Sequence, residues 1–483
     1  MLGLGLSIVG QWRLEWGALA VLGFAPLYFL LDRELTPELF VGPCVMIYAY
    51  HALGYALGPV AQVYLVSYTT FVEAGFVPAQ WGCVVGLATF ALVYPTVFRF
   101  KSQPINANEA DRALVSIPGR QWKQYGLFML GWSAFIIAFG YLTGAQRRLG
   151  AVETTVGMQT LVAAFISARH VVWFFLGFCA VRFGRRWTWF WLVSIIPYSA
   201  YVFLDGSRGW VVYAFVMSAN GAALAGVSTR KLALGLIVFV IAFSPFAAII
   251  SDYRISYRGG DLSVTDRAAH FQTIAGEYFT QYDQGALGWM NTILWQSTAH
   301  WVDRIFLLTP NVIPYAGLQD LGRLLYIYTP RVLLPNRPNP RTGGETACLY
   351  AVASGAMRSD DPTCGIGDYI PTVGEGYRRF GWVGIPLMYV VLAVVYGWIL
   401  RQIWLRRSRV EWAAMLIVVM TASAEVWGTP LVDIFYIVGW EFPKYFIFFW
   451  VVRWLLDKFV DKPDRLPYMH RSATSFRGQW NGW

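Results

Sequence analysis

Arginine is the residue type whose distribution in this sequence most strongly suggests binding chemistry. Between residues 251 and 379 the chain carries eleven arginines and no lysine. The planar guanidinium group binds phosphate and carboxylate through paired hydrogen bonds, whereas the lysine ammonium acts as a point charge. An anionic ligand is therefore one interpretation of this segment. The other is a solvated segment whose arginines pair with its own acids, and for most of the eleven we favour it.

A further arginine, Arg208, lies in the short polar stretch "LDGSRGW" (residues 204–210) between two almost wholly apolar runs. Asp205 or Ser207 can cap a helix that we expect to begin near Trp210. The free amides at that helix N-terminus and the Arg208 guanidinium would together form an anion site. The alternative is an interfacial arginine whose charged end reaches water along its aliphatic stem.

Arg169, in "AFISARHVVWFF", falls near the middle of a predicted membrane span. A charge at that depth is costly and usually faces a cavity or a partner. We therefore expect Arg169 to line the same cavity as Arg208. A displaced span boundary is the alternative interpretation.

Candidates for proton transfer are a carboxylate and a histidine. Glu375, in "VGEGYRRFGWVG", precedes a predicted span, where a carboxylate is either a partner of the helix dipole or a general base for a hydroxyl group. His300 is a second candidate base, although a histidine on an amphipathic helix is more often interfacial. Glu345 and Asp368 are weaker candidates of the same kind.

The elements that position these residues are predicted to be membrane-spanning helices. The 483 residues are 57% hydrophobic and only 14% charged, with a mean hydropathy of +0.46, which is too little charge to cover a soluble domain of this length. Apolar runs of roughly 20 residues, the length that crosses a bilayer, recur along the chain. The net charge of +10 falls mostly in short loops between these runs, as expected for cytoplasmic loops. Nucleic-acid binding is therefore not expected.

We predict an all-α polytopic membrane protein with about ten to twelve transmembrane helices and one large structured periplasmic loop. The predicted spans are residues 15–31, 40–58, 81–98, 124–143, 159–181, 187–204, 210–226, 232–250, 380–400, 411–427 and 436–456.

Four regions follow from this pattern. Residues 1–250 form about eight N-terminal spans, 251–375 the periplasmic loop, 376–460 about three C-terminal spans, and 461–483 a cytoplasmic tail. Basic clusters between the spans assign their loops to the cytoplasm and the 251–375 segment to the outside. The chain is thus predicted to be a multi-pass membrane protein.

The outer segment contains no motif for a metal or a nucleotide. It holds an amphipathic stretch around residues 287–308, followed by a proline- and glycine-rich path that forbids a long helix. Cys348 and Cys364 both lie here, and an oxidising compartment would allow a disulfide between them, with two free thiols as the alternative. The sequence shows no CxxC pair, HExxH motif or phosphate-binding glycine loop, so neither a cofactor nor a metal is expected.

Four stretches in a fixed order around this loop resemble one family. They are "LDGSRGW", "RIFLLTPNVIPYAG", "YTPRVLLPNRPNP" and "GEGYRRFGWVGI". Together they resemble the Wzy-type O-antigen and exopolysaccharide repeat-unit polymerases, which are related to the O-antigen ligases and belong to the GT-C glycosyltransferases. The resemblance covers roughly residues 200–400. Leu334 and Arg337 stand where the family commonly has tryptophan and lysine.

The resemblance implies a multi-pass protein of a bacterial inner membrane that transfers glycosyl groups on the outer, periplasmic face of that membrane. The donor would be a glycan on polyprenyl diphosphate, and the acceptor the terminal hydroxyl of another lipid-linked repeat unit. Arginines would stabilise the departing diphosphate without a divalent metal. That role is assigned first to Arg208, then to Arg304 and Arg331, and then to Arg169 and Arg337, with Glu375 as the first choice of general base and His300 as the second. The partners implied are this lipid-linked oligosaccharide and membrane lipid, and such polymerases usually work with a flippase and a chain-length regulator.

Two other functions remain open. An O-antigen ligase, which transfers finished polymer to lipid A core, would use the same anion site and give His300 the larger role. A transporter of lipid-linked glycan would place charges along a path through several spans and have little structure outside. The sparse charge within the predicted spans makes that third function less favoured.

Overall fold

The computed structural model describes just over half of the chain in separate stretches. The described residues are 18, 20–22, 47, 51–57, 73–99, 119–142, 166–204, 208–227, 231, 232, 234, 235, 238, 239, 242, 243, 246, 249, 250, 253, 264–281, 299–319, 321–326, 329, 343–356, 358, 370–406, 409–415, 434, 435 and 437–459. Within them all regular secondary structure is helical and no strand occurs.

Three of the described helices are long and apolar enough to cross a membrane. They cover Gly75–Val97, Arg185–Leu204 and Thr372–Gln402, and Trp210–Leu224 is a shorter apolar helix. The prediction of an all-helical chain with membrane-spanning segments is confirmed to this extent.

One group of helices packs around α10 (Val171–Phe183). Its neighbours are α8 (Gly119–Leu142), α11 (Arg185–Leu204) and α12 (Arg208–Leu224). A single residue, Gly184, links α10 to α11 with φ at +82°. That conformation strains any residue with a side chain, so glycine permits this abrupt turn.

Glycines let α10 and α12 approach each other closely. An added Cβ at Gly177 would overlap the backbone of Ser218, and one at Gly221 would overlap the carbonyl group of Phe174. Small residues at such crossings are typical of helix pairs that pack in lipid, where close van der Waals contact replaces the hydrophobic driving force.

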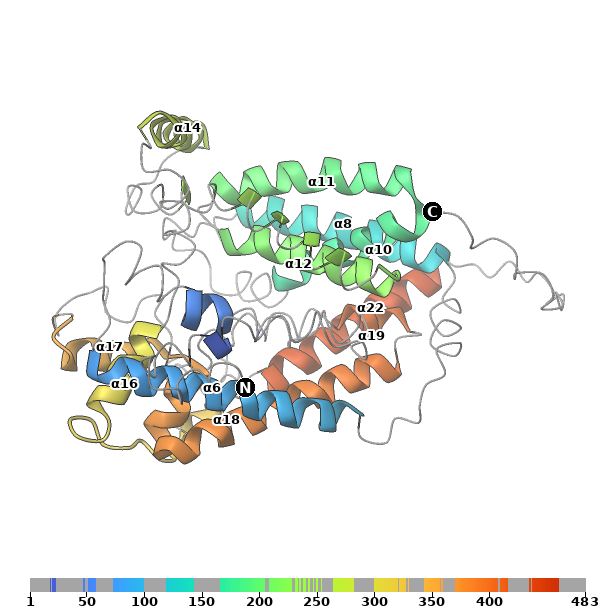
Figure 1. Ribbon diagram of the computed structural model, residues 1–483. Helices are drawn as coiled ribbons and strands as arrows, with labels where there is room; N and C mark the ends of the chain where they lie inside the picture. The colour runs from blue at the N-terminus through green and yellow to red at the C-terminus, as the bar shows by residue number, and fades with distance from the viewer. Residues whose placement is uncertain are drawn as a thin grey trace.

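A second group of helices surrounds α6 (Glu73–Arg99). α6 packs against α18 (Thr372–Leu405) and α16 (Ala299–Leu308), while α17 (Gly343–Ala353) lies beside α16. Glycines again face the partners, since a Cβ at Gly86 would overlap the ring of Tyr389. Figure 1 shows the two groups as separate layers, with α8, α10, α11 and α12 above α6 and α18.

The remaining elements are short or lie at the edges of these two groups. They are the π-helices η1 (His51–Leu57) and η5 (Ile437–Glu441), the 3-10 helices η3 (Ile166–His170) and η4 (Leu321–Tyr326), and the α-helices α14 (Val264–Gln281), α19 (Val410–Ala414) and α22 (Phe442–Phe459). Trp132 of α8 and Phe448 of α22 connect the two groups, with ring centroids 5.1 Å apart.

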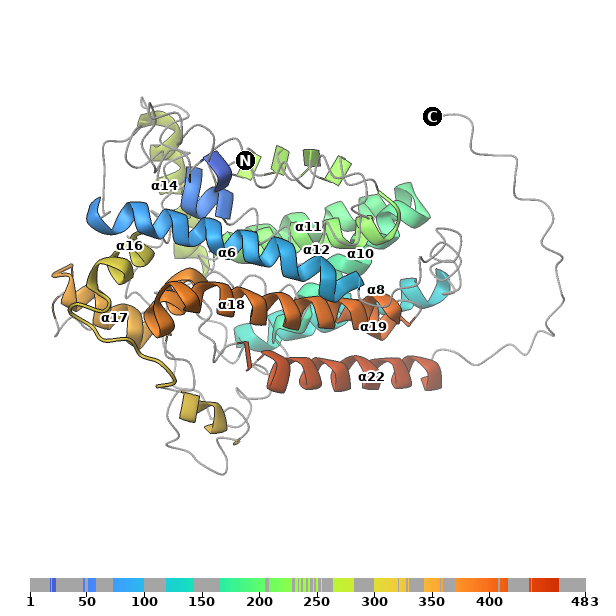
Figure 2. The same ribbon diagram turned by 60° about the horizontal axis from the view of Figure 1, so that its bottom comes forward.

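Helix α18 is two helices joined by a sharp bend. Phe380 and Gly381 leave the helical conformation, and Gly381 has φ at +62°. The backbones of Gly376 and Gly384 touch across the bend, although eight residues of straight helix would separate them by about 12 Å. The short first half, which carries Glu375, is visible as a turned-back segment at the end of α18 (Figure 2).

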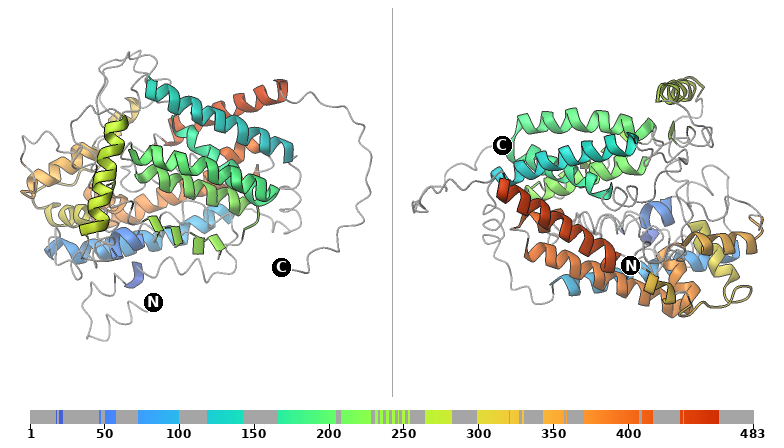
Figure 3. Two further views of the ribbon diagram at one scale, coloured as in Figure 1. Left: turned by 90° about the horizontal axis from the view of Figure 1, so that it is seen from above. Right: turned by 180° about the vertical axis from the view of Figure 1, so that it is seen from behind.

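The two ends of the structure carry different helices and loops. The helices of the 251–375 segment lie at one end, together with the starts of α6, α12 and α18, whereas the α10–α11 turn and the last turns of α6, α18 and α22 lie at the other (Figures 1 and 3). Basic residues mark that second end: Arg120, Lys123, Arg182, Arg185, Arg186, Arg401, Arg406, Arg409 and Lys458.

Several predicted spans correspond to observed helices with shifted bounds. The span predicted at 187–204 begins at Arg185, and the one at 210–226 begins at Arg208. The largest difference concerns the span at 159–181, because residues 166–170 form a 3-10 helix before α10. Arg169 therefore lies in this 3-10 helix, before the α-helix begins.

The α10–α12 crossing gives a test of the packing. Gly221→Val should lower the free energy of unfolding by about 3 kcal/mol, because the added side chain meets backbone atoms that cannot rotate away. Gly131→Val in α8 is the matched control, since no atom lies within 4 Å of its Cβ position, and it should change stability by less than about 1 kcal/mol. Unfolding temperatures of the purified proteins in detergent measure both. Equal temperatures for the two variants would contradict this crossing.

Candidate functional site

The Arg169 guanidinium is almost fully buried beside the start of α12. The residue is 4% exposed. Its Nε donates a hydrogen bond to Nε2 of His170 at 3.3 Å, and its guanidinium carbon lies 5.1 Å from the centre of the Trp210 ring. Trp210 belongs to the first turn of α12. The structure thus brings Arg169 to the N-terminus of the helix that Arg208 begins.

The charge of Arg169 has no acidic partner in the described part of the chain. Ion pairs there join Arg323, Arg378, Arg379, Arg453 and Lys444 to carboxylates, and none involves Arg169. A buried cation without a counter-ion is costly. This position is therefore suited to an anion that the described residues do not themselves supply.

The first turn of α12 adds a second attraction for an anion. The first amides of an α-helix have no partner within the helix, and the aligned peptide dipoles leave partial positive charge there. Arg208 is the first residue of α12, two residues before the Trp210 ring that contacts Arg169. Only the backbone of Arg208 is described. Its position at the start of α12 places it near Arg169, another of the arginines predicted to bind the anion.

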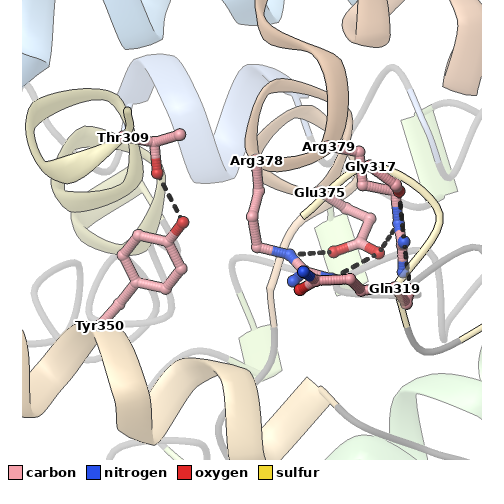
Figure 4. A network of polar contacts seen from close by, with 7 residues as sticks. All are labelled: Thr309, Gly317, Gln319, Tyr350, Glu375, Arg378 and Arg379. Atoms are coloured by element: carbon pink, nitrogen blue, oxygen red, sulfur yellow. Dashed lines mark hydrogen bonds and ion pairs between the residues drawn. The ribbon is translucent and has the colours of Figure 1, made fainter. Parts of the chain in front are cut away.

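Glu375 occupies a different environment, in which its carboxylate pairs with two arginines. Its carboxylate is buried between two guanidinium groups (Figure 4). Oε2 accepts a bond from Nε of Arg378 at 2.9 Å, and Oε1 accepts bonds from Nη2 of Arg378 at 3.1 Å and Nε of Arg379 at 2.6 Å. The two arginines favour the ionised carboxylate and occupy both of its oxygens.

The same ion-pair cluster fastens an irregular part of the outer segment to α18. Nη1 of Arg379 donates to the carbonyls of Gly317 at 2.9 Å and Gln319 at 2.8 Å, as Figure 4 shows. The amides of Ala316 and Gly317 in turn donate to the carbonyls of Arg378 and Arg379. Glu375 is thus positioned to hold this segment in place.

Helix α16 carries two more predicted residues to the start of α18. Arg304 is partly exposed, with its guanidinium over the Trp301 ring at 5.2 Å, and His300, described in its backbone only, lies one turn earlier. Phe306 stacks on Tyr377 with ring centroids 3.8 Å apart. Arg304 and Glu375 therefore lie on elements in direct contact.

Helix α17 is tied to the end of α16. Tyr350 and Thr309 share a hydrogen bond of 2.6 Å. Burial raises the pKa of the Tyr350 phenol, which the hydrogen bond with Thr309 opposes. Cys348 of α17 is disulfide-bonded, whereas its predicted partner Cys364 lies outside the described residues, as do Arg331, Arg337 and Asp368.

Sequence reasoning did not assign roles to several residues of these clusters. Arg378 and Arg379 follow Glu375 at the i+3 and i+4 spacing that places side chains on one helix face, so their pairing was open to prediction. The contacts of His170 with Trp210 and Tyr198 join distant parts of the chain, and no local signal indicates them. Among the described residues no group of three or more His, Cys, Asp and Glu could hold a metal ion.

The Glu375 cluster predicts a large stability effect. Glu375→Gln leaves two buried guanidinium groups without their counter-ion and should destabilise the protein by about 3–5 kcal/mol. Glu345→Gln is the matched control, because the Arg323–Glu345 ion pair is 30% and 60% exposed at its two side chains and should contribute less than about 1 kcal/mol.

Thermal unfolding of both purified variants checks this prediction. If Glu375→Gln unfolds at the wild-type temperature but has lost its activity, the carboxylate serves chemistry rather than structure.

No family model, curated protein or solved structure matches this chain. What the protein does is therefore argued from the charge, burial and placement of Arg169, α12 and the α16–α18 contact.

Proposed function

We propose that this protein is a membrane-embedded glycosyltransferase that polymerises polyprenyl-diphosphate-linked oligosaccharide repeat units into a surface polysaccharide. It would be a multi-pass protein of a bacterial inner membrane, with the 251–375 segment on the periplasmic face. The partners in this proposal are the lipid-linked oligosaccharide, membrane lipid, a flippase and a chain-length regulator. The proposal extends the resemblance of four sequence stretches to the Wzy-type polymerases.

The observation that carries the proposal is the buried Arg169 guanidinium beside the first turn of α12, which no carboxylate of the described residues neutralises. A polyprenyl diphosphate has an anionic head and an apolar tail, and so suits a positive site at the end of apolar helices. Arginine forms paired hydrogen bonds with phosphate oxygens, and helix N-terminal amides bind the same groups.

The distribution of basic residues supports the proposed orientation. Arg120, Arg186, Arg406 and Lys458 belong to the end of the structure opposite the 251–375 helices. Cytoplasmic loops are enriched in arginine and lysine. The end that carries Arg169 and Arg208 would then face the periplasm.

The chemistry of the proposal is a displacement at the anomeric carbon of the donor. The acceptor hydroxyl oxygen forms the new C–O bond as the bond to the diphosphate breaks, and the bonding electrons leave with the polyprenyl diphosphate. Arg169 and Arg208 stabilise that charge, with Arg304, Arg331 and Arg337 as further candidates. The proton passes from the hydroxyl to a general base.

Glu375 and His300 remain the candidates for that base. Glu375 could act only after Arg378 or Arg379 released one of its oxygens, since both oxygens already accept hydrogen bonds. His300 lies on α16, one turn before Arg304. An O-antigen ligase would use the same anion and the same histidine, and its product on lipid A core would distinguish it from a polymerase.

The proposed orientation predicts the outcome of cysteine labelling. Asn311→Cys, at an exposed position of the outer segment, should react with a membrane-impermeant maleimide in intact spheroplasts. Lys458→Cys, exposed at the opposite end, should react only after the cells are opened. Wild-type protein gives the background from the native cysteines. The reverse pattern would exclude a periplasmic site.

The proposed chemistry predicts which arginines are needed for activity. Purified protein should elongate polyprenyl-diphosphate-linked oligosaccharide without an ion gradient, and Arg169→Ala or Arg208→Ala should reduce that rate by about 100-fold, as the loss of a preorganised charge does elsewhere. Arg186→Ala, exposed at the opposite end, is the control and should retain the wild-type rate. Movement of the lipid-linked sugar across vesicles without elongation would favour a transporter.

A further inference from the structure

We propose that His170, held by Tyr198 and Trp210, positions the Arg169 guanidinium for a diphosphate while leaving its positive charge free. This inference rests on the proposed function, because it names how the same site prepares for its anionic ligand. It adds three residues with no role in the reaction itself.

The hydrogen bonds around His170 determine its tautomer. A guanidinium nitrogen can only donate, so Nε2 of His170 accepts the bond from Nε of Arg169. A neutral imidazole has one donor and one acceptor, so Nδ1 carries the proton and donates to the Tyr198 hydroxyl oxygen, 3.0 Å away. A protonated imidazole would have no acceptor for Arg169, and the arrangement therefore requires neutral His170.

Ring stacking fixes the plane of the same imidazole. His170 lies parallel to Trp210, with ring centroids 4.4 Å apart and planes 12° apart. The guanidinium of Arg169 also contacts the Trp210 ring, an interaction that cations favour. Both neighbours of Arg169 are thus oriented by the first turn of α12.

The choice of a neutral partner has an electrostatic consequence. Nε of Arg379 also donates to a side chain, but to the carboxylate of Glu375, which gives that guanidinium a negatively charged partner. Nε of Arg169 donates to an imidazole, which fixes the orientation of the guanidinium without neutralising its charge. The Tyr198 hydroxyl, which also interacts with the Arg169 side chain, is uncharged as well, so no partner of Arg169 among the described residues cancels its positive charge, and the guanidinium suits phosphate oxygens.

The test is the binding of farnesyl diphosphate, a short and soluble polyprenyl diphosphate, to the full-length protein in nanodiscs. Farnesol, which shares the apolar tail but has no charge, is the reference ligand. His170→Phe keeps a flat ring against Trp210 and removes the acceptor, so it should weaken diphosphate binding about tenfold, as the loss of one charge-assisted hydrogen bond does. Farnesol binding should not change.

Two further substitutions separate orientation from charge. His170→Gln offers a carbonyl acceptor near the place of Nε2 and should bind farnesyl diphosphate within about threefold of wild type. His170→Glu would pair with Arg169 and neutralise it, and should bind more weakly than His170→Phe. A role in packing alone predicts no such order of affinities.

His51 is the matched control. It is equally buried, and its ring also bonds a tyrosine, with Nε2 lying 2.8 Å from the Tyr389 hydroxyl and Nδ1 bonded to the Ile47 carbonyl. His51→Phe should lower the unfolding temperature yet bind farnesyl diphosphate within about twofold of wild type, because it belongs to the α6–α18 side of the structure.

The outcomes distinguish this inference from the proposed function. If wild-type protein binds farnesyl diphosphate no better than farnesol, the proposed function fails. If wild type discriminates and His170→Phe discriminates equally well, only the positioning role fails. If His170→Phe does not fold, three other variants decide the question: Tyr198→Phe, which removes the partner of Nδ1, His170→Gln and His170→Glu. If all three bind farnesyl diphosphate as tightly as wild type does, the inference is overturned.

Discussion

The burial of the Arg169 guanidinium without a carboxylate partner among the described residues is the constraint on which the rest of the proposed site depends. Arg169 and Arg379 are both buried arginines, and each donates through Nε to a neighbouring side chain. Arg379 donates to the carboxylate of Glu375, which gives it a counter-ion. Arg169 meets His170 and keeps its charge. A buried arginine can therefore have two different electrostatic states in this protein. Whether the side chain that accepts from Nε is a carboxylate or a neutral imidazole determines which state it has.

This electrostatic arrangement requires helices that hold their positions closely. Glycines at 177 and 221 bring α10 and α12 into backbone contact, which places Trp210 over Arg169 and His170. On the other side of the structure, the bend at Gly381 turns the start of α18 back on itself, so that Arg378 and Arg379 reach the 316–319 segment. Each site is thus built where a glycine allows an approach that a larger residue would block.

Much of the helical framework could be predicted, because long apolar runs have few alternatives in a membrane protein. The spans at 187–204 and 210–226 fell within two residues of the observed helix starts, since Gly184 and the polar 204–210 stretch mark their ends. The bend within α18 and the 3-10 turn before α10 could not be predicted, because both arise from packing rather than hydropathy. From the sequence we expect Arg169 and Arg208 to line one cavity, and the structure places Arg169 beside Trp210, two residues after Arg208. The contact of His170 with Tyr198 could not be predicted, since it spans 28 residues of sequence.

Burial of the unpaired Arg169 charge lowers the stability of the free protein, and this loss is linked to the binding energy of an anion. A site that keeps a buried charge unpaired lowers the stability of the ligand-free protein, and an anion that binds only the folded state restores it. The favourable energy of that binding is then available where charge grows during bond cleavage, on the leaving diphosphate rather than on the neutral sugar. A carboxylate in place of His170 would neutralise Arg169 in the ligand-free protein. The binding of an anion would then no longer add stability by neutralising that charge. In the proposed site, the neutral imidazole orients Arg169 and leaves the neutralisation of its charge to the diphosphate of the substrate.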